Sequence, residues 1–437
     1  MQTEVVPYVA INLLATVRTL QKTLSQAAKQ SLDRRFGALY DKVYRDDVLW
    51  QAWFQVRQND GGPGVDGETL QYIEREIGVQ RFLDELRDQL KAGSYRPQPV
   101  KRVWIEKPGN PKARRPLGIP VVRDRIIQTA VRLVIEPIFE TNFLDCSYGF
   151  RPGRKPHDAI SEIERSITFS GYREVVDADL KSYFDSIPQD TLMELVGRRI
   201  SDRRVLGLIK AWLKCGVMEE GNVRRATTGT PQGGCISPLL SNVYLHAFDK
   251  MWQLWGVKGT KLVRFADDFV ILCRHSSRKA LRRVREFLER LGLTLNEEKT
   301  HVVHVRRGFD FLGMTFRYDR TSHRAKRLKY NCYRWPRRKA VASLKEKIRR
   351  KIGRRFSLSL QEIIREINPI LRGWYNYFKV GHSQQHFQRL DRFVINRLRI
   401  FVKRKRSDPG RGIRNIADGL LDHLGLFRLA RLRVSIS

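Results

Sequence analysis

Long apolar runs and closely spaced cysteines are missing from this sequence, and acidic residues are scarce relative to basic ones. No apolar run approaches the roughly 20 residues that a membrane-spanning helix needs. The apolar run from Val5 to Val17 is short and follows Glu4 rather than a basic segment, so we expect no secretory signal peptide. These absences predict a protein with no membrane partner.

The chain has only five cysteines, an odd number. None lie close together in the sequence, and their spacing matches no zinc-binding pattern. We therefore expect buried free thiols, a reducing compartment such as the cytoplasm, and no disulfide framework. The five are Cys146, Cys215, Cys235, Cys273 and Cys332.

The charge is strongly unbalanced. Among 437 residues, 83 Lys and Arg face 46 Asp and Glu, a formal net charge of +37. The stretch from Ser322 to Ser437 alone has 31 basic residues and 7 acidic ones. Such an excess indicates a polyanionic partner, most simply a nucleic acid. An anionic membrane surface is the alternative, but no polybasic tail stands beside an anchor.

The order of patterns indicates an α+β protein. Helical patterns cover residues 1–35 and continue over 36–56, and β-prone runs alternate with helical ones from about residue 95 to residue 317. We expect a small antiparallel sheet in that region. After Arg317 the strand signals fade, and residues 337–404 read as two or three basic helices.

Two adjacent acids lie in the middle of a β-hairpin pattern. Asp267 and Asp268 lie between two short apolar, β-prone runs, Leu262, Val263 and Phe265 on one side and Phe269–Leu272 on the other. Like charges this close are tolerated if water solvates them or if a divalent cation neutralises them. By itself the pair is compatible with an ordinary polar turn.

A third carboxylate would favour the cation. Asp179 lies where a β-prone run gives way to a helical one, so a neighbouring strand could bring it to the hairpin tip. Three carboxylates around two Mg²⁺ ions is an arrangement that transfers phosphoryl groups. Asp177, two residues earlier, and Asp185, six residues later, remain alternatives.

Ordered motifs add a family resemblance. The chain resembles the reverse transcriptases, and its upstream motifs and one downstream segment are similar to those of the bacterial group II intron type. The palm-type motifs are Val175–Ile187, Gly229–Asn242, Arg264–Phe269, Leu295–Thr300 and Phe311–Gly313; the upstream motifs are Pro116–Pro120, Asp124–Gln128 and Ser147–Gly153, and the maturase-type segment is Leu371–Phe378.

This resemblance implies a right-hand polymerase of fingers, palm and thumb. It predicts an N-terminal helical extension over 1–35, fingers over 36–172 and a palm with a small antiparallel sheet over 173–320. A helical thumb or maturase domain then covers 321–405. The short basic segment 406–437, with Arg428, Arg431 and Arg433, is a possible remnant of a DNA-binding domain. No endonuclease signature follows residue 405.

The resemblance also implies roles for particular residues. Asp179, Asp267 and Asp268 match the metal-binding aspartates, and Lys299 matches a lysine near the leaving pyrophosphate, a general acid. Phe184 matches the residue that blocks a ribose 2′-hydroxyl. The metal set is Asp179, Leu180, Asp267 and Asp268; the nucleotide-binding set is Lys107, Arg115, Phe184 and Gln232; the RNA-binding set is Arg151, Arg337, Arg338, Lys339, Arg349, Arg350 and Lys351.

The function implied is RNA-directed DNA synthesis in the bacterial cytosol, with two Mg²⁺ ions, dNTPs, an RNA template and a DNA primer or target. Group II intron RNA is the expected partner, bound to assist its splicing. Phe265 stands where most members carry Tyr, and we expect activity to survive because the ring remains. A free-standing reverse transcriptase and a non-enzymatic maturase are the competing hypotheses. The oligomeric state is not indicated.

Overall fold

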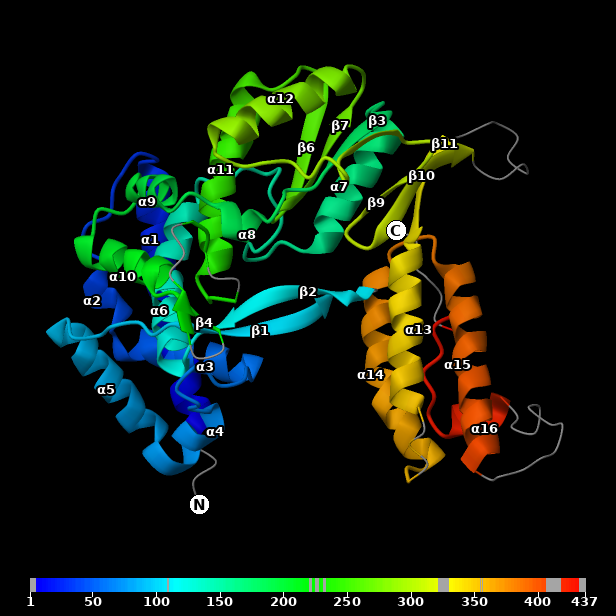
Figure 1. Cartoon of the computed structure of the whole chain (residues 1–437), viewed down its shortest axis with the longest axis horizontal. Coiled ribbons are helices and arrows are strands. Elements are labelled where there is room, and N and C mark those ends of the chain that lie inside the picture. Colours follow the sequence, from blue (N-terminus) through cyan, green and yellow to red (C-terminus); the bar gives the residue numbers. More distant parts are fainter. Residues whose placement is uncertain are drawn as a thin grey trace.

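The structure is a computed structural model, and it describes residues 5–107, 110–219, 222–224, 228–230, 233–320, 330–353, 355, 357–405 and 418–431. Its elements fall into three groups that follow the chain (Figure 1). N-terminal helices lie on one side, a sheet with its covering helices lies in the middle, and long C-terminal helices lie on the other side. We call these groups the fingers, the palm and the thumb.

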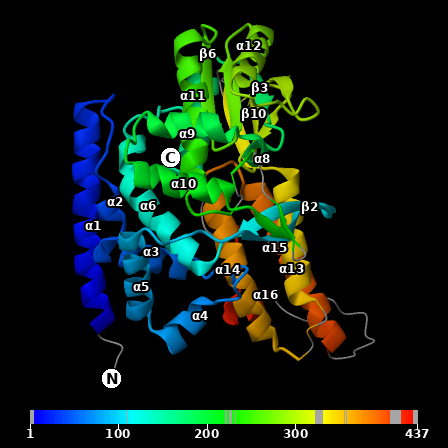
Figure 2. The ribbon, with the colours of Figure 1, turned by 60° about the vertical axis from the view of Figure 1, so that its left-hand side comes forward.

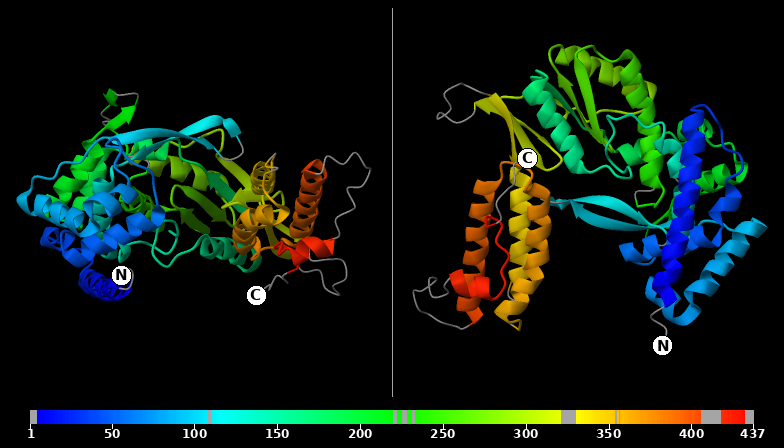
Figure 3. Two further views of the ribbon diagram at one scale, coloured as in Figure 1. Left: turned by 90° about the horizontal axis from the view of Figure 1, so that it is seen from below. Right: turned by 180° about the vertical axis from the view of Figure 1, so that it is seen from behind.

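The fingers are built mainly from helices. The long α1 packs along α3 and α6, as the view from behind shows (Figure 3). Gln21 of α1 donates a hydrogen bond from Nε2 to the Leu133 carbonyl at 3.0 Å, which ties α1 to α6. The helices are α1 (Val5–Gln30), α2 (Tyr40–Val43), α3 (Asp46–Asn59), α4 (Leu70–Tyr72), the π-helix η1 (Ile73–Ile77), α5 (Val79–Ala92) and α6 (Val122–Glu140).

The single helix expected over residues 36–56 is wrong. Phe36 instead forms a bridge with Ile200, and the chain then bends into α2 and α3. The carboxylate of Asp202 explains the bend. Its Oδ2 accepts the backbone N–H groups of Leu39 and Tyr40, both at 2.8 Å, and its Oδ1 caps the start of α10.

A β-hairpin projects from the fingers toward the thumb (Figure 1). Its two strands pair antiparallel, and the first also pairs parallel with β4, giving the sheet order β2-β1-β4-β5. Helix α9 contacts both α10 and the palm helix α11 (Ser237–Trp255), and the three lie close together in Figure 2. The bounds are β1 (Val100–Lys107), β2 (Asn110–Ile119), β4 (Val217–Glu219), β5 (Asn222–Arg224), α9 (Gln189–Gly197) and α10 (Arg203–Lys214).

The palm sheet has the order β6-β7-β3-β8, with every neighbouring pair antiparallel. Because successive strand residues point to opposite faces, the sheet separates two cores. Phe269 and Ile271 belong to the core under α11 and α12, while Val270 and Leu272 belong to the core shared with α7 and the thumb. The bounds are β3 (Glu174–Ala178), β6 (Thr260–Phe265), β7 (Asp268–Cys273), β8 (His301–His304), α7 (Pro156–Phe169), α8 (Tyr183–Ser186), α11 (Ser237–Trp255) and α12 (Ser277–Arg290).

A second antiparallel sheet, in the order β11-β10-β9, connects the palm to the thumb. The strand β11 lies after Arg317, where the strand signals of the sequence fade, and directly before the helices expected from residue 337. Alternating burial in β11 explains the strand, because Cys332, Arg334 and Pro336 are buried while the residues between them are half-buried. The bounds are β9 (Phe309–Phe311), β10 (Met314–Arg320) and β11 (Tyr330–Pro336).

The thumb is a bundle of three long helices with a shared apolar core. Ile367 and Leu371 of α14 and Phe387 of α15 are fully buried in it. The central helix α14 begins at a capping box, in which Ser359 and Glu362 satisfy each other's backbone N–H groups. The bounds are α13 (Arg338–Ile352), α14 (Leu360–Phe378), α15 (Gln384–Lys405) and the short α16 (Asp418–His423).

The described part of the C-terminal segment packs on the thumb and does not stand apart from it. Asp391 of α15 accepts the backbone N–H groups of Leu429 and Ala430, both at 2.9 Å. Arg428, expected on a DNA-binding surface, instead has a side chain that is only 8% exposed and is paired with Asp422 at 2.8 Å. Arg431 pairs with the same carboxylate, while Arg433 lies outside the described residues.

The α+β class and the succession of fingers, palm and thumb expected from the sequence are confirmed. Among the described residues, no helix is both long enough and apolar enough to cross a membrane. All five cysteines are free.

Candidate active site

The two hairpin acids lie at the tip of the palm sheet. Phe265 of β6 pairs with Asp268 of β7, so only Ala266 and Asp267 form the turn. Asp267 is half-buried, whereas the side chain of Asp268 is exposed. This tight turn fixes both carboxylates at one end of the sheet.

The third acid comes from the neighbouring strand. In the ladder between β3 and β7, Ala178 pairs with Phe269, so Asp179 stands opposite Asp268 just beyond the last pair. Desolvation raises the pKa of Asp268 to about 6, and repulsion from Asp267 and Asp179 adds to it. Burial likewise raises the pKa of Asp267, and Asp179 acts on it in the same direction. The three carboxylates are therefore close enough to repel one another.

The structure separates Asp179 from its two alternatives. Asp177 lies two residues before Asp179, so both side chains lie on the same face of the strand. Burial and the charges of Asp268, Asp310 and Asp179 raise the pKa of Asp177 to about 7. Asp185 is exposed on α8, and the charge that acts on its pKa comes from Arg102. Asp179 thus interacts with both hairpin acids, Asp177 with Asp268, and Asp185 lies apart.

Lys299 lies against the acids. The loop after α12 is fixed to the end of β3, because the Asn296 N–H donates to the Asp179 carbonyl at 2.8 Å. Lys299 Nζ then lies 2.9 Å from Asp179 Oδ2, and its charge also lowers the pKa of Asp268. The side chain of Leu180 is buried, so only its backbone could contact a metal.

The donor chemistry of the acids suits Mg²⁺, which prefers carboxylate and carbonyl oxygens. Within the described ranges, no group of three or more Asp, Glu, His or Cys side chains is arranged so that it could hold a metal ion. In this structure the Lys299 ammonium pairs with the carboxylate of Asp179. A divalent cation would relieve the repulsion among three acids that Lys299 neutralises only in part.

Of the predicted nucleotide-binding residues, the structure describes the side chains of two. Arg115 of β2 is exposed and close enough to Asp267 to lower its pKa, so it faces the acids. Phe184 follows on α8, five residues after Asp179. The side chain of Lys107 and the whole of Gln232 lie outside the described residues, and both stay predictions.

A glycine loop holds Phe184 in place. The Thr230 N–H donates to the Phe184 carbonyl at 2.7 Å, and the Gly229 N–H donates to the Ile187 carbonyl at 2.8 Å. Gly229 has a φ of 89°, and a Cβ there would lie 2.8 Å from the Phe184 oxygen. Only glycine permits this approach, so the loop and α8 form one support.

Most of the predicted RNA-binding residues line the thumb helix α13. Arg338 and Lys339 are exposed at its start, and Arg349, Arg350 and Lys351 are exposed at its end. Two of the latter form surface ion pairs, Arg349 with Glu346 and Lys351 with Glu366, and such pairs contribute little stability. Arg337 differs, since it is half-buried and its charge acts on Asp268.

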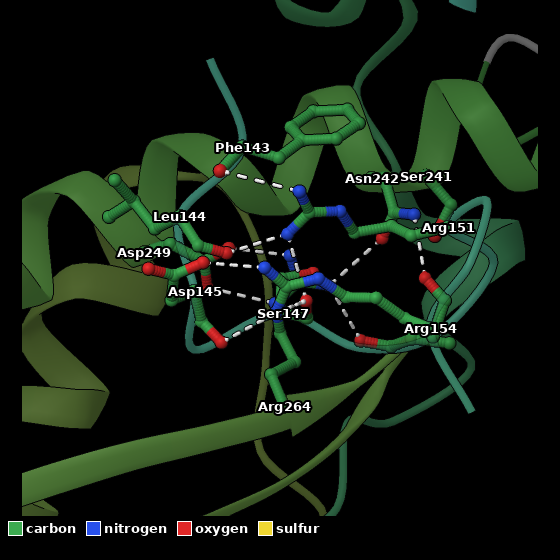
Figure 4. Close-up of polar contacts among 12 residues, drawn as sticks. Phe143, Leu144, Asp145, Ser147, Arg151, Arg154, Ser241, Asn242, Asp249 and Arg264 are labelled. Carbon is green, nitrogen blue, oxygen red and sulfur yellow. Dashed lines mark hydrogen bonds and ion pairs between the residues drawn. The ribbon is translucent and has the colours of Figure 1, made fainter. Parts of the chain in front are cut away.

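The prediction that Arg151 binds RNA is wrong. Its side chain is only 4% exposed, and Nη2 pairs with Glu140 at 2.5 Å. Nη1 donates to the carbonyls of Leu144 and Ser147, at 2.7 Å and 2.9 Å (Figure 4). The guanidinium therefore holds the loop before α7 and has no free face for a phosphate.

The structure also contains a buried polar group beside the palm hairpin that the sequence patterns do not indicate. It consists of Arg264 on β6 and of Asn242 and Asp249 on α11 (Figure 4). A signal was available: Arg264 interrupts an apolar strand, and Asp249 lies on the buried side of α11. Charged residues at buried positions require partners.

Two family profiles match the chain. Residues 105–316 match the family described as "Reverse transcriptase (RNA-dependent DNA polymerase)". Residues 341–415 match the "Group II intron, maturase-specific domain". The first match spans the acids, Lys299 and the hairpin, and the second begins within α13.

Two individual relatives are similar to about two thirds of this chain. The chain is 38% identical over 337 residues to "Protein YkfC" of Escherichia coli (strain K12), covering 68% of this chain and 87% of that protein. It is 31% identical over 365 residues to "Group II intron-encoded protein LtrA" of Lactococcus lactis subsp. cremoris, of which it spans only 59%. A solved chain of the "Partial Cas6-RT-Cas1--Cas2 complex" is 25% identical, with a TM-score of 0.37 and coverage of 57% and 42%, a likeness too slight to support inference.

Desolvation of Asp268, together with its repulsion by Asp267 and Asp179, predicts a pH-dependent cost in stability. A folded-state pKa of about 6 for Asp268 exceeds the unfolded value of about 3.9. The folded chain therefore binds more protons over this window, and its stability falls as the pH rises through it.

Without metal, we expect the Asp268→Asn variant to have a higher melting temperature than wild type at pH 7.5. Because the side chain is exposed, we discount the gain to about 1 kcal/mol, or roughly 2–4 °C. The difference in melting temperature between the variant and wild type should disappear near pH 4. Thermal melts in EDTA would measure it, with Asp88→Asn on the outer face of α5 as the control. A wild type as stable as Asp268→Asn at pH 7.5 would contradict this electrostatic account.

Proposed function

This chain belongs to the group II intron reverse transcriptases, RNA-directed DNA polymerases that carry a maturase domain, and we propose how its residues carry out both tasks. DNA is synthesised at the palm hairpin, and the thumb binds the intron RNA whose splicing it assists. The observation that supports synthesis most is the convergence of Asp179 with Asp267 and Asp268, beside the ammonium of Lys299.

Reverse transcriptases depend on a divalent metal, and here two Mg²⁺ ions would be held by the three aspartates and the Leu180 backbone. When bound, such ions favour the 3′-oxygen as a nucleophile and stabilise charge on the leaving pyrophosphate. Lys299 can release Asp179 and donate a proton to that pyrophosphate. Its ion pair with Asp179 keeps it within reach of the reacting groups.

The remaining residues position the nucleotide. Arg115 approaches the acids from β2 and would grip the triphosphate, together with Lys107 at the end of β1. Phe184 would pack against the sugar where a ribose carries its 2′-hydroxyl, and Gln232 would lie near the incoming base. Tyr183 supports Phe184 from the side, with ring centroids 5.2 Å apart.

The thumb supplies the RNA-binding surface. α13 presents Arg338, Lys339, Arg349, Arg350 and Lys351 to solvent, and cations spaced along a helix can follow a phosphate backbone. Arg337 directly precedes this helix, and its charge acts on Asp268, so we propose that it contacts the primer–template strand nearest the acids. The maturase match over the thumb favours intron RNA over the alternative of a free-standing reverse transcriptase.

The metal site can be tested by primer extension. Wild type should extend oligo(dT) on poly(rA) with Mg²⁺, and Asp267→Asn/Asp268→Asn should lose on the order of 10³-fold in rate. RNA binding should persist, because it rests on the thumb. Asp185→Asn is the matched control and should retain activity. Failure of wild type to extend the primer would refute the synthesis role. Loss of RNA binding together with extension in the Asp267→Asn/Asp268→Asn variant would show that the acids have a structural role.

Phe184 should govern the choice of sugar. Phe184→Val opens space beside the nucleotide, so the preference for dNTP over rNTP, measured as the ratio of kcat/KM values, should fall at least about tenfold. Tyr183→Phe keeps the neighbouring ring and should leave the ratio unchanged. If Phe184→Val discriminates as wild type does, the ring is an ordinary core aromatic.

The end of α13 should contribute to RNA affinity. Replacing Arg349, Arg350 and Lys351 with Ala should weaken group II intron RNA binding and flatten the slope of log K against log salt by about 2. Replacing Arg278, Lys279 and Arg282 on α12 removes the same charge from the outer palm and serves as the control. Equal effects of the two triple variants would show that only net charge matters.

A further inference from the structure

Arg264 is fully buried beside the catalytic turn. Its side chain and that of Asp249 are both 0% exposed, and they form a two-point ion pair, with Nε–Oδ1 at 2.8 Å and Nη2–Oδ2 at 2.5 Å. Burying such a pair costs several kcal/mol per ion before the attraction is counted. An apolar residue would suit the same strand at lower cost, so stability alone does not account for the pair.

The remaining donor of Arg264 reaches the turn itself. Nη1 donates to the Ala266 carbonyl at 2.9 Å and to Asn242 Oδ1 at 3.1 Å. Ala266 directly precedes Asp267, and its φ of 57° lies in the left-handed region. That conformation costs a non-glycine residue about 1–3 kcal/mol and persists only where the surroundings enforce it. The hydrogen bond from Arg264 is one such restraint.

A second restraint holds the other side of the turn. The segment Cys146–Gly149 runs beside β6, where the Arg264 N–H donates to the Cys146 carbonyl and the Tyr148 N–H donates to the Arg264 carbonyl, both at 2.8 Å. A Cβ on Gly149 would lie 2.3 Å from the Ala266 nitrogen, so only glycine allows the contact.

Asn242 joins the two restraints. Its Nδ2 donates to the Gly149 carbonyl at 2.8 Å, while its Oδ1 accepts from Arg264. Helix α11 carries both Asn242 and Asp249, so one helix holds the Arg264 guanidinium at two points (Figure 4).

We infer that Arg264, oriented by Asp249 and Asn242, is a positioning residue that aims the carboxylates of Asp267 and Asp268 through its hydrogen bond to the Ala266 carbonyl. This inference rests on the proposed synthesis role of those acids. Arg264 itself is sealed from substrate, and it acts by holding the turn in a strained conformation. Small misplacements of groups at a reacting centre can reduce a rate by about 100-fold.

The test removes the pair without leaving a buried charge. Arg264→Met/Asp249→Leu replaces both partners with apolar groups, an exchange that is often neutral or stabilising. Arg334→Met/Glu164→Leu removes another largely buried pair, 2.5 Å long, that does not touch the turn. Both variants and wild type are compared by thermal melts, steady-state primer extension, and calorimetric titration with Mn²⁺ in the absence of nucleic acid.

We expect the Arg264→Met/Asp249→Leu variant to fold and to bind primer–template as wild type does. Its kcat should fall at least about tenfold while the KM for dNTP changes by less than about twofold. Its Mn²⁺ affinity should fall as well, and the Arg334→Met/Glu164→Leu control should change neither property. A folded variant with wild-type kcat and wild-type Mn²⁺ affinity would overturn the inference.

Two further outcomes are distinguishable. If the double variant does not fold, Arg264→Lys provides the test, because its single ammonium cannot bind Asp249 and the Ala266 carbonyl together. A folded Arg264→Lys variant with reduced Mn²⁺ affinity supports the positioning role. Unchanged Mn²⁺ affinity in that variant refutes it. If wild type does not extend primers, the synthesis role fails, and the Mn²⁺ titration still reports on the turn.

Discussion

Repulsion among the carboxylates of Asp179, Asp267 and Asp268 is the constraint on which the rest of the structure depends. Two β-strands bring these acids to one end of the palm sheet, and the chain offsets their charge with cations from four separate segments. Arg264 and Arg115 act on Asp267, and Lys299 and Arg337 act on Asp268. Fingers, palm and thumb therefore each contribute a charge to the same point. The residual repulsion is what a divalent cation would relieve.

The same site concentrates structural strain. The turn before Asp267 adopts a left-handed conformation at Ala266, and a buried ion pair between Arg264 and Asp249 lies directly beneath it. A site that costs stability yet is held rigidly is typical of a site shaped for reaction rather than for stability. The helix α11 has a central place in this arrangement because it carries Asp249 and also covers one face of the palm sheet.

Much of this could be predicted from the sequence, where the signal is local. The hairpin acids, Asp179 and the basic helices of the thumb follow from alternation, charge and ordered motifs. The prediction failed where a distant group decides the local structure. The carboxylate of Asp202 interrupts the helix expected after Phe36, and Glu140 binds the guanidinium of Arg151, which is therefore not available to RNA. Pairing with β10 stabilises β11 as a strand. Local patterns do not report such partners.

The most direct test of the central claim is a double-mutant cycle on metal binding. Mn²⁺ affinity would be measured by the electron paramagnetic resonance of free Mn²⁺ for wild type, Asp179→Asn, Asp268→Asn and the double variant. If the acids of the two strands form one site, each single variant weakens binding and the double loses clearly less than the sum of the two losses. Strictly additive losses, or single variants that bind as wild type does, would contradict the account.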